Sequence, residues 1–111
     1  MQKVNLKHLK SSLAKIMSNE KFKIRVPENF EKKFNKLKLS KKVVFRIEEK
    51  IKTLESKPYN IFSPDISKSV NPSLPGCYIL RAGNYRIFYD INSDSKEVIL
   101  LTIEHRSKAY K

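Results

Sequence analysis

The chain has 111 residues, 40% of them hydrophobic, and a formal net charge of +13 from 24 basic and 11 acidic residues. This size fits one small domain with one core, and the hydrophobic fraction argues against global disorder. We expect no membrane span, because no apolar run reaches about 18 residues, and no secretory signal. Cys77 is the single cysteine, so we expect no internal disulfide. The lack of a disulfide suits a cytoplasmic location.

The positive charge is concentrated in the first half of the chain. Residues 1–26 hold seven basic and one acidic residue (+6), residues 27–57 hold ten and five (+5), and residues 58–111 hold seven and five (+2). Such an excess attracts polyanions, although lysines on solvated helix faces would give the same count. The two histidines lie far apart and show no metal-ligand spacing, so we expect no metal ion and no cofactor.

Residues 3–17 predict an amphipathic helix, because apolar side chains recur at helical spacing. The apolar stripe is formed by Leu6, Leu9, Leu13 and Ile16, and lysines stand off it. We interpret residues 1–20 as an N-terminal helical extension and residues 21–111 as the main domain. The extension either covers a partner groove or contacts RNA, or it packs on its own domain or frays.

The next elements are a strand and two helices. Alternation over 22–26 predicts a half-buried strand, which Pro27 ends while opening a helix to about Lys38. Ser40 is the expected N-cap of a second helix that ends before Pro58. The short link predicts an antiparallel helical hairpin.

A sheet completes the expected fold. The Ser/Pro/Asn-rich stretch 59–76 predicts a loop, and the apolar run 98–103 predicts a last strand that is buried on both faces and pairs with the first strand. The predicted class is α+β, with the helical hairpin packed on one face of a small, mainly antiparallel twisted β-sheet.

Residues 77–91 (CYILRAGNYRIFYDI) predict the β-hairpin that carries the candidate site. A turn at Gly83-Asn84 places Arg81 opposite Arg86, with Cβ atoms roughly 5 Å apart. Because facing like charges are destabilising and guanidinium groups suit phosphate oxygens, the pair indicates an anion site. The alternative is that each arginine pairs with a carboxylate such as Asp90 or Glu104.

The segments LRAGNYRIFYDI and EHRSKAYK resemble the RelE/ParE superfamily of toxins from toxin–antitoxin pairs, closest to the RelE branch. The resemblance covers about residues 21–111. It implies a small cytoplasmic ribonuclease that enters the ribosomal A site and cuts messenger RNA, using the RNA 2′-hydroxyl as nucleophile and no metal. The implied partners are messenger RNA, ribosomal RNA and a cognate antitoxin, which we expect to be acidic.

The resemblance also implies roles for individual residues. By matching positions, Arg86 holds the scissile phosphate, Arg106 stabilises charge or assists the leaving oxygen, and Tyr110 orients a base or moves a proton. Arg81 joins them by its cross-strand position.

Three features of the sequence depart from the family pattern: two positions that are usually basic, the N-terminal helix, which the short family members lack, and the Ser/Pro-rich loop, which is longer than the usual link to the hairpin. The RelE branch often carries basic residues where this chain has Cys77 and Ile79, and His105 could compensate because its pKa range suits acid–base work. This loss leaves open a ParE-like inhibitor of DNA gyrase that does not cut RNA. A third alternative is an inactive toxin remnant whose N-terminal helix covers the groove that an antitoxin helix would use.

Overall fold

The structure is a computed structural model that describes residues 21–59, 62–70, 73–74 and 76–109. The predicted N-terminal helix and Tyr110 lie outside these residues, and so does the proposed extension 1–20. The described elements, in chain order, are β1 (Lys23–Arg25), α2 (Glu28–Lys36), α3 (Lys41–Lys52), the short 3-10 helix η2 (Thr53–Glu55), β2 (Ile66–Lys68), β3 (Tyr78–Ala82), β4 (Tyr85–Asn92) and β5 (Glu97–His105). No helix among them is long and apolar enough to cross a membrane.

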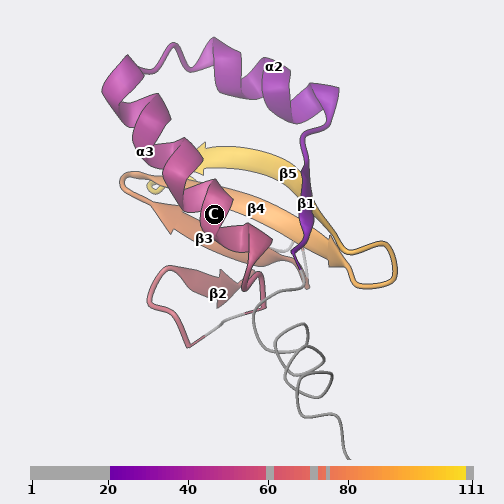
Figure 1. Cartoon of the computed structure of the whole chain (residues 1–111). Helices are drawn as coiled ribbons and strands as arrows, with labels where there is room; N and C mark the ends of the chain where they lie inside the picture. The colour runs from indigo at the N-terminus through magenta and orange to yellow at the C-terminus, as the bar shows by residue number, and fades with distance from the viewer. Residues whose placement is uncertain (1–20, 60–61, 71–72, 75, 110–111) are drawn as a thin grey trace, which may run out of the picture.

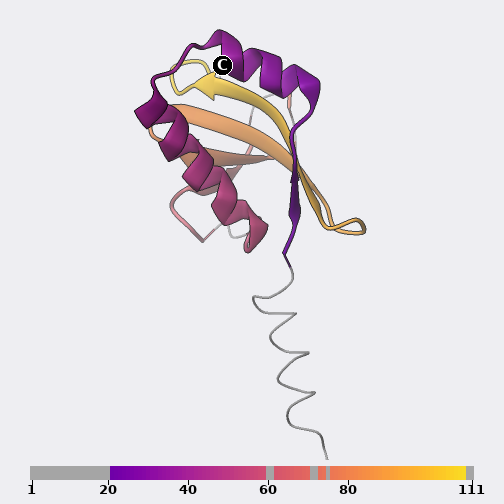
Figure 2. The ribbon, with the colours of Figure 1, turned by 45° about the horizontal axis from the view of Figure 1, so that its top comes forward.

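The five strands form one sheet in the order β1-β5-β4-β3-β2 (Figure 1). The predicted pairing of the first strand with the last is confirmed, and it is parallel, whereas the other pairs are antiparallel. Both helices lie on one side of the sheet (Figures 1 and 2). The α+β prediction is therefore confirmed.

The two helices begin as the sequence predicts. Helix α2 follows Pro27, and the Ser40 hydroxyl caps α3 by accepting a hydrogen bond from the Val43 amide at 3.3 Å. They do not pack along each other as an antiparallel pair, and this expectation was wrong. They diverge from their link, α2 toward β5 and α3 toward β3 (Figures 1 and 2), because each helix buries its apolar stripe against the sheet.

Apolar side chains on the two faces of the sheet form two separate clusters. The main cluster lies under the helices, and its members include Phe30 of α2, Ile47 of α3, and Ile87 and Tyr89 of β4. Because side chains alternate along a strand, the neighbouring residues point to the other face. There a small second cluster contains Cys77, Ile79, Phe88 and Ala109, with Leu74 packed against it.

Two expectations for the strands need correction. The stretch 59–76 is not entirely loop, because Ile66–Lys68 form the edge strand β2 beside β3. The last strand is not buried on both faces throughout, because Leu101 is 36% exposed. The pairing steps from Phe88–Thr102 to Tyr89–Leu100, so Leu101 is the extra residue of a bulge.

Candidate anion-binding site

The hairpin between β3 and β4 has the register that the sequence predicts. Arg81 lies directly opposite Arg86, and Ala82 lies opposite Tyr85. Gly83 adopts a φ of 61°, a left-handed value that favours glycine, at the first central position of the turn. A glycine there fits a two-residue turn of type II′, which matches the twist of the two strands.

The two arginines stand on the sheet face that the helices do not cover. Arg81 is exposed and Arg86 is half-buried. The Nη1 atom of Arg86 donates to the carbonyl oxygens of Gly83 and Tyr85, both at 2.9 Å, while its Nε is buried without a hydrogen-bond partner. Neither arginine forms an ion pair with any described residue, so their charges are available to an anion.

Glu104 does not neutralise Arg86, although β5 places it directly opposite. Lys33 reaches from α2 and binds the Glu104 carboxylate, and it also donates to the Thr102 hydroxyl at 2.7 Å. Asp90, the other predicted partner, accepts a hydrogen bond from the Ile91 amide at 2.9 Å. The structure therefore contradicts the alternative in which Asp90 and Glu104 pair with the two arginines.

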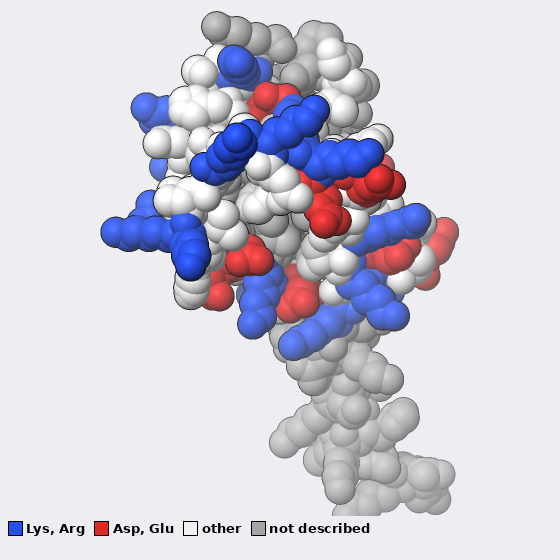
Figure 3. Space-filling view, turned by 90° about the horizontal axis from the view of Figure 1, so that it is seen from above, with Lys and Arg blue, Asp and Glu red and all other residues white. Residues whose placement is uncertain are grey.

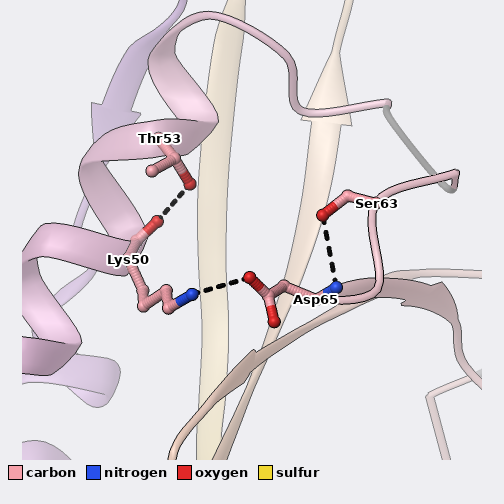
Figure 4. Close-up of polar contacts among 4 residues, drawn as sticks. All are labelled: Lys50, Thr53, Ser63 and Asp65. Atoms are coloured by element: carbon pink, nitrogen blue, oxygen red, sulfur yellow. Dashed lines mark hydrogen bonds and ion pairs between the residues drawn. The ribbon is translucent and has the colours of Figure 1, made fainter.

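The backbone of Arg81 is held by contacts that lead back to α3. The Arg81 amide donates to the Asp65 carbonyl at 2.7 Å. The Asp65 carboxylate pairs with Lys50 at 2.6 Å, and the Asp65 amide donates to the Ser63 hydroxyl at 3.2 Å (Figure 4). Helix α3 and the turn before β2 thus fix the edge of the site.

The end of β5 brings Arg106 to the same turn. The Arg106 amide donates to the Asn84 carbonyl at 2.7 Å, and the Arg106 side chain is exposed. The structure therefore places Arg106 beside the hairpin turn that joins Arg81 to Arg86. Tyr110 lies outside the described residues, and its role stays a prediction.

His105 does not share the sheet face of Arg81 and Arg86, although it directly precedes Arg106 in the chain. It is opposite Tyr85 in the sheet, and the two rings meet edge to face with centroids 5.5 Å apart. Tyr85 packs against the cluster under the helices, so the imidazole lies on the face away from Arg86. Its Nδ1 accepts a hydrogen bond from the Ser107 amide at 3.2 Å. A compensating acid–base role for His105 stays a prediction that this placement does not favour.

Cys77 and Ile79 share the arginine face but are buried. They pack with Phe88 under Ala109 and Leu74. The Cys77 thiol donates to the Leu74 carbonyl at 3.3 Å, and burial raises its pKa, outweighing the opposite effect of a hydrogen bond with Ser69. A buried, protonated thiol is not a nucleophile, so this part of the face supplies apolar surface and no chemistry.

Two lysines that support the site could not be identified from the sequence. Lys33 and Lys50 lie on predicted helices, where they resemble other solvent-exposed lysines, and their partners Glu104 and Asp65 are 71 and 15 residues away. No local pattern marks such pairs. In the described part of the chain, no three His, Cys, Asp or Glu side chains gather closely enough to hold a metal ion.

The fold is shared with RelE-like toxins of known structure. Similar structures include an archaeal RelE–RelB complex from Pyrococcus horikoshii (TM-score 0.63, 24% identity, covering 80% of this chain and 99% of that one). The toxin–antitoxin complex RelBE2 from Mycobacterium tuberculosis is comparable (TM-score 0.62, 22% identity, 78% and 99%). A mutant of Escherichia coli RelE in the free state is more distant (TM-score 0.53, 21% identity, 80% and 86%).

A family model described as the ParE toxin of the type II toxin–antitoxin system parDE matches residues 24–110. The chain therefore belongs to this toxin family, within the RelE/ParE superfamily, and the resemblance drawn from its sequence is confirmed. No curated protein sequence matches the chain.

Proposed function

We propose that this toxin is a ribosome-dependent endoribonuclease that cuts messenger RNA without a metal ion. The observation that supports the proposal is the pair of facing arginines, neither of which has a carboxylate partner among the described residues. Such a pair is destabilising by itself, and a phosphodiester between the two guanidinium groups would turn this repulsion into attraction.

Arg86 is the residue that we expect to hold the scissile phosphate. Its Nη1 is occupied by two backbone carbonyls, whereas its buried Nε has a proton and no acceptor. An unsatisfied buried donor is costly, and the Arg86 side chain would have to turn outward for a phosphate oxygen to reach and satisfy its Nε. Arg81 and Arg106, on either side, would share the charge that develops on the phosphorane.

The reaction that fits such a site is attack by a neighbouring 2′-hydroxyl. The 2′-oxygen would bond to phosphorus as the bond from phosphorus to the 5′-oxygen breaks, which leaves a 2′,3′-cyclic phosphate and a 5′-hydroxyl. One proton leaves the 2′-oxygen and one reaches the 5′-oxygen, so the step needs groups that move protons. Tyr110 is our candidate for proton transfer or base stacking, and Arg106 for assisting the leaving oxygen.

The proposed partners follow from charge and from the solved complexes. A net charge of +13 favours association with ribosomal and messenger RNA. The similar RelE structures from Pyrococcus horikoshii and Mycobacterium tuberculosis are toxin–antitoxin complexes. We therefore propose that a cognate acidic antitoxin binds this chain in the cytoplasm and restrains it.

The decisive test is cleavage of a translated message in a cell-free system. Purified protein should cut the message, and Arg86→Ala should lower the rate by about 100-fold or more, because it removes the main donor to the developing charge. Arg25→Ala is a matched control. Arg25 is an exposed arginine of the edge strand β1, which β5 separates from the strand of Arg86. Intact message in the presence of folded wild-type protein would refute the proposal.

A second candidate function is inhibition of DNA gyrase without RNA cleavage. The apolar cluster around Cys77 and Ile79 favours gyrase inhibition. In the RelE branch, which the sequence resembles, basic residues often occupy these two positions. A supercoiling assay separates the two functions. Inhibited gyrase with intact message would establish this alternative, and a folded protein inactive in both assays would point to a toxin remnant.

A further inference from the structure

A cavity opens on the helix-covered side of the molecule, where α2 and α3 diverge. Its volume is about 380 Å³. Its apolar lining comes from β1 and the residue after it, both helices and β5, and consists of Ile24, Val26, Phe30, Phe34, Ile51 and Leu100. Val26 is 48% exposed there. We call this feature the helix groove. It lies on the face opposite the arginine pair and serves no step of the proposed reaction.

The rim of the helix groove is acidic, although the protein is strongly basic. Glu31, Glu48 and Glu55 line it together with one lysine, Lys52. None of the three carboxylates forms an ion pair with a described residue. Figure 3 shows acidic side chains among the basic ones on the face seen from above. Such a rim disfavours an acidic partner and suits an apolar segment that carries lysines.

The chain itself contains a segment with these properties. Leu6, Leu9, Leu13 and Ile16 repeat at spacings of three, four and three residues, the pattern of anchors that an amphipathic helix presents to an apolar groove. Four lysines stand off this stripe: Lys3, Lys7, Lys10 and Lys15. We propose that residues 3–17 form a helix that docks in the helix groove of the same molecule.

The attachment point of this segment favours docking within one chain. The Phe22 amide donates to the Glu55 carbonyl at 2.8 Å, so the chain enters the described fold beside a residue of the groove. The six steps from Ile16 to Phe22 can span up to about 20 Å. A linker this short gives the segment a high effective concentration at the groove. A second molecule could compete only if its own concentration exceeded this value.

Docking would make the helix groove a regulated surface. The segment would cover Val26 and neutralise part of the acidic rim while leaving Arg81, Arg86 and Arg106 open on the other face. A partner helix that uses the groove would first have to displace residues 3–17. This inference does not depend on RNA cleavage, because its test reads protection of the backbone and not activity.

The test is hydrogen–deuterium exchange of the full-length protein, followed by mass spectrometry. Amides of residues 6–16 should exchange at least tenfold more slowly than in an isolated peptide of residues 1–20. Leu13→Lys should abolish this protection, whereas Ser11→Lys, which introduces the same side chain off the stripe, should preserve it. Glu48→Lys should weaken protection, and Asp94→Lys, an equal charge change outside the groove in the turn between β4 and β5, should not.

Three results would overturn the proposal. Exchange of residues 6–16 at the rate of the peptide would show that the segment does not dock. Protection that survives Glu48→Lys and a second groove variant, Ile51→Lys, would place the segment elsewhere. Protection that falls on dilution would identify a second copy as the occupant. Thermal unfolding of each variant confirms that the core is intact, so that lost protection reports on docking alone.

Discussion

The two faces of the sheet differ in what they contribute to the molecule. Under the helices, large apolar side chains such as Ile87 and Tyr89 are completely buried in the main cluster. On the other face the second cluster is small, and the arginine pair stands beside it without a carboxylate partner among the described residues. One face therefore supplies most of the folding free energy, and the other tolerates the repulsion that an anion site requires.

Strand β4 shows how closely these two roles are interleaved. Arg86 and Ile87 are consecutive residues, yet one belongs to the arginine face and the other to the main cluster. A shift of one residue in register would exchange them, which would bury a guanidinium and expose an isoleucine. Burial under the helices thus fixes the register, and the register in turn places the arginines opposite each other.

The largest effect that we expect from this comparison concerns two isoleucines truncated on opposite faces. Ile87→Ala should lower the free energy of unfolding by about 4 kcal/mol, and Ile79→Ala by about 2–3 kcal/mol. Both side chains are at most 1% exposed, but Ile79 belongs to the small cluster, where neighbours can move into the space left behind. Urea denaturation measures both values.

Ile24→Ala, on the half-buried edge strand β1, is a control that should cost less than either. If Ile79→Ala proved as costly as Ile87→Ala, the second cluster would be a full part of the core. The arginine face would then have to be regarded as a structural surface as well.

The local features of this molecule could be predicted from the sequence. The turn at Gly83-Asn84 fixes the hairpin register through adjacent residues, so the facing arginines followed from pattern alone. The Ser40 cap and the apolar stripes are equally local. The face of His105 is different, because the bulge at Leu101 shifts the alternation of β5 by one residue, and only the pairing with β4 places His105 opposite Tyr85.

The missed features depend on contacts between distant residues. Lys33 binds Glu104 only because α2 crosses β5, and β2 is a strand only because β3 offers it a free edge. The divergence of the two helices is likewise set by the sheet beneath them. In each case the residues carry no distinctive local pattern, and the tertiary arrangement decides their role.

A smaller effect is expected from the ion pair that separates Glu104 from Arg86. Lys33→Met should lower message cleavage by about tenfold, because the released carboxylate can then neutralise Arg86 across the strands. The side chains of the pair are 40% and 29% exposed, so the cost to stability should stay below about 1 kcal/mol. Single-turnover cleavage and urea denaturation give the two readouts.

The double variant Lys33→Met with Glu104→Gln distinguishes this mechanism from a simple packing defect. Removing the acid should restore most of the activity that Lys33→Met lost, a coupling that a double-mutant cycle quantifies. Lys32→Met is the matched control, because Lys32 pairs with Glu28 on the exposed side of α2. Equal losses from Lys32→Met and Lys33→Met would show that general positive charge matters and that Glu104 does not.

The smallest effect concerns the buried hydroxyl of Tyr89, on the helix-covered face. It donates to the Pro58 carbonyl at 2.7 Å, and burial, with a smaller contribution from Tyr78, raises its pKa above the ordinary value for tyrosine. Tyr89→Phe should lower the free energy of unfolding by about 1 kcal/mol at pH 7, since it removes this hydrogen bond and leaves the carbonyl unsatisfied.

The pH dependence of this loss in the free energy of unfolding tests whether the Tyr89 hydroxyl is shielded from water in the folded protein. The unfolded chain ionises Tyr89 above about pH 10 while the folded protein keeps the proton, so the unfolded state binds fewer protons and wild-type stability falls as the pH rises. The Phe variant lacks this ionisation, so the gap between the two proteins should narrow above pH 10 by about 1 kcal/mol per pH unit. Urea denaturation from pH 7 to 11 measures the gap, and Tyr59→Phe, at an exposed tyrosine, should leave the wild-type curve unchanged. A constant gap across this range would mean that Tyr89 ionises as easily in the folded protein as in the unfolded chain, and that the helix-covered face is less shielded from water than its packing indicates.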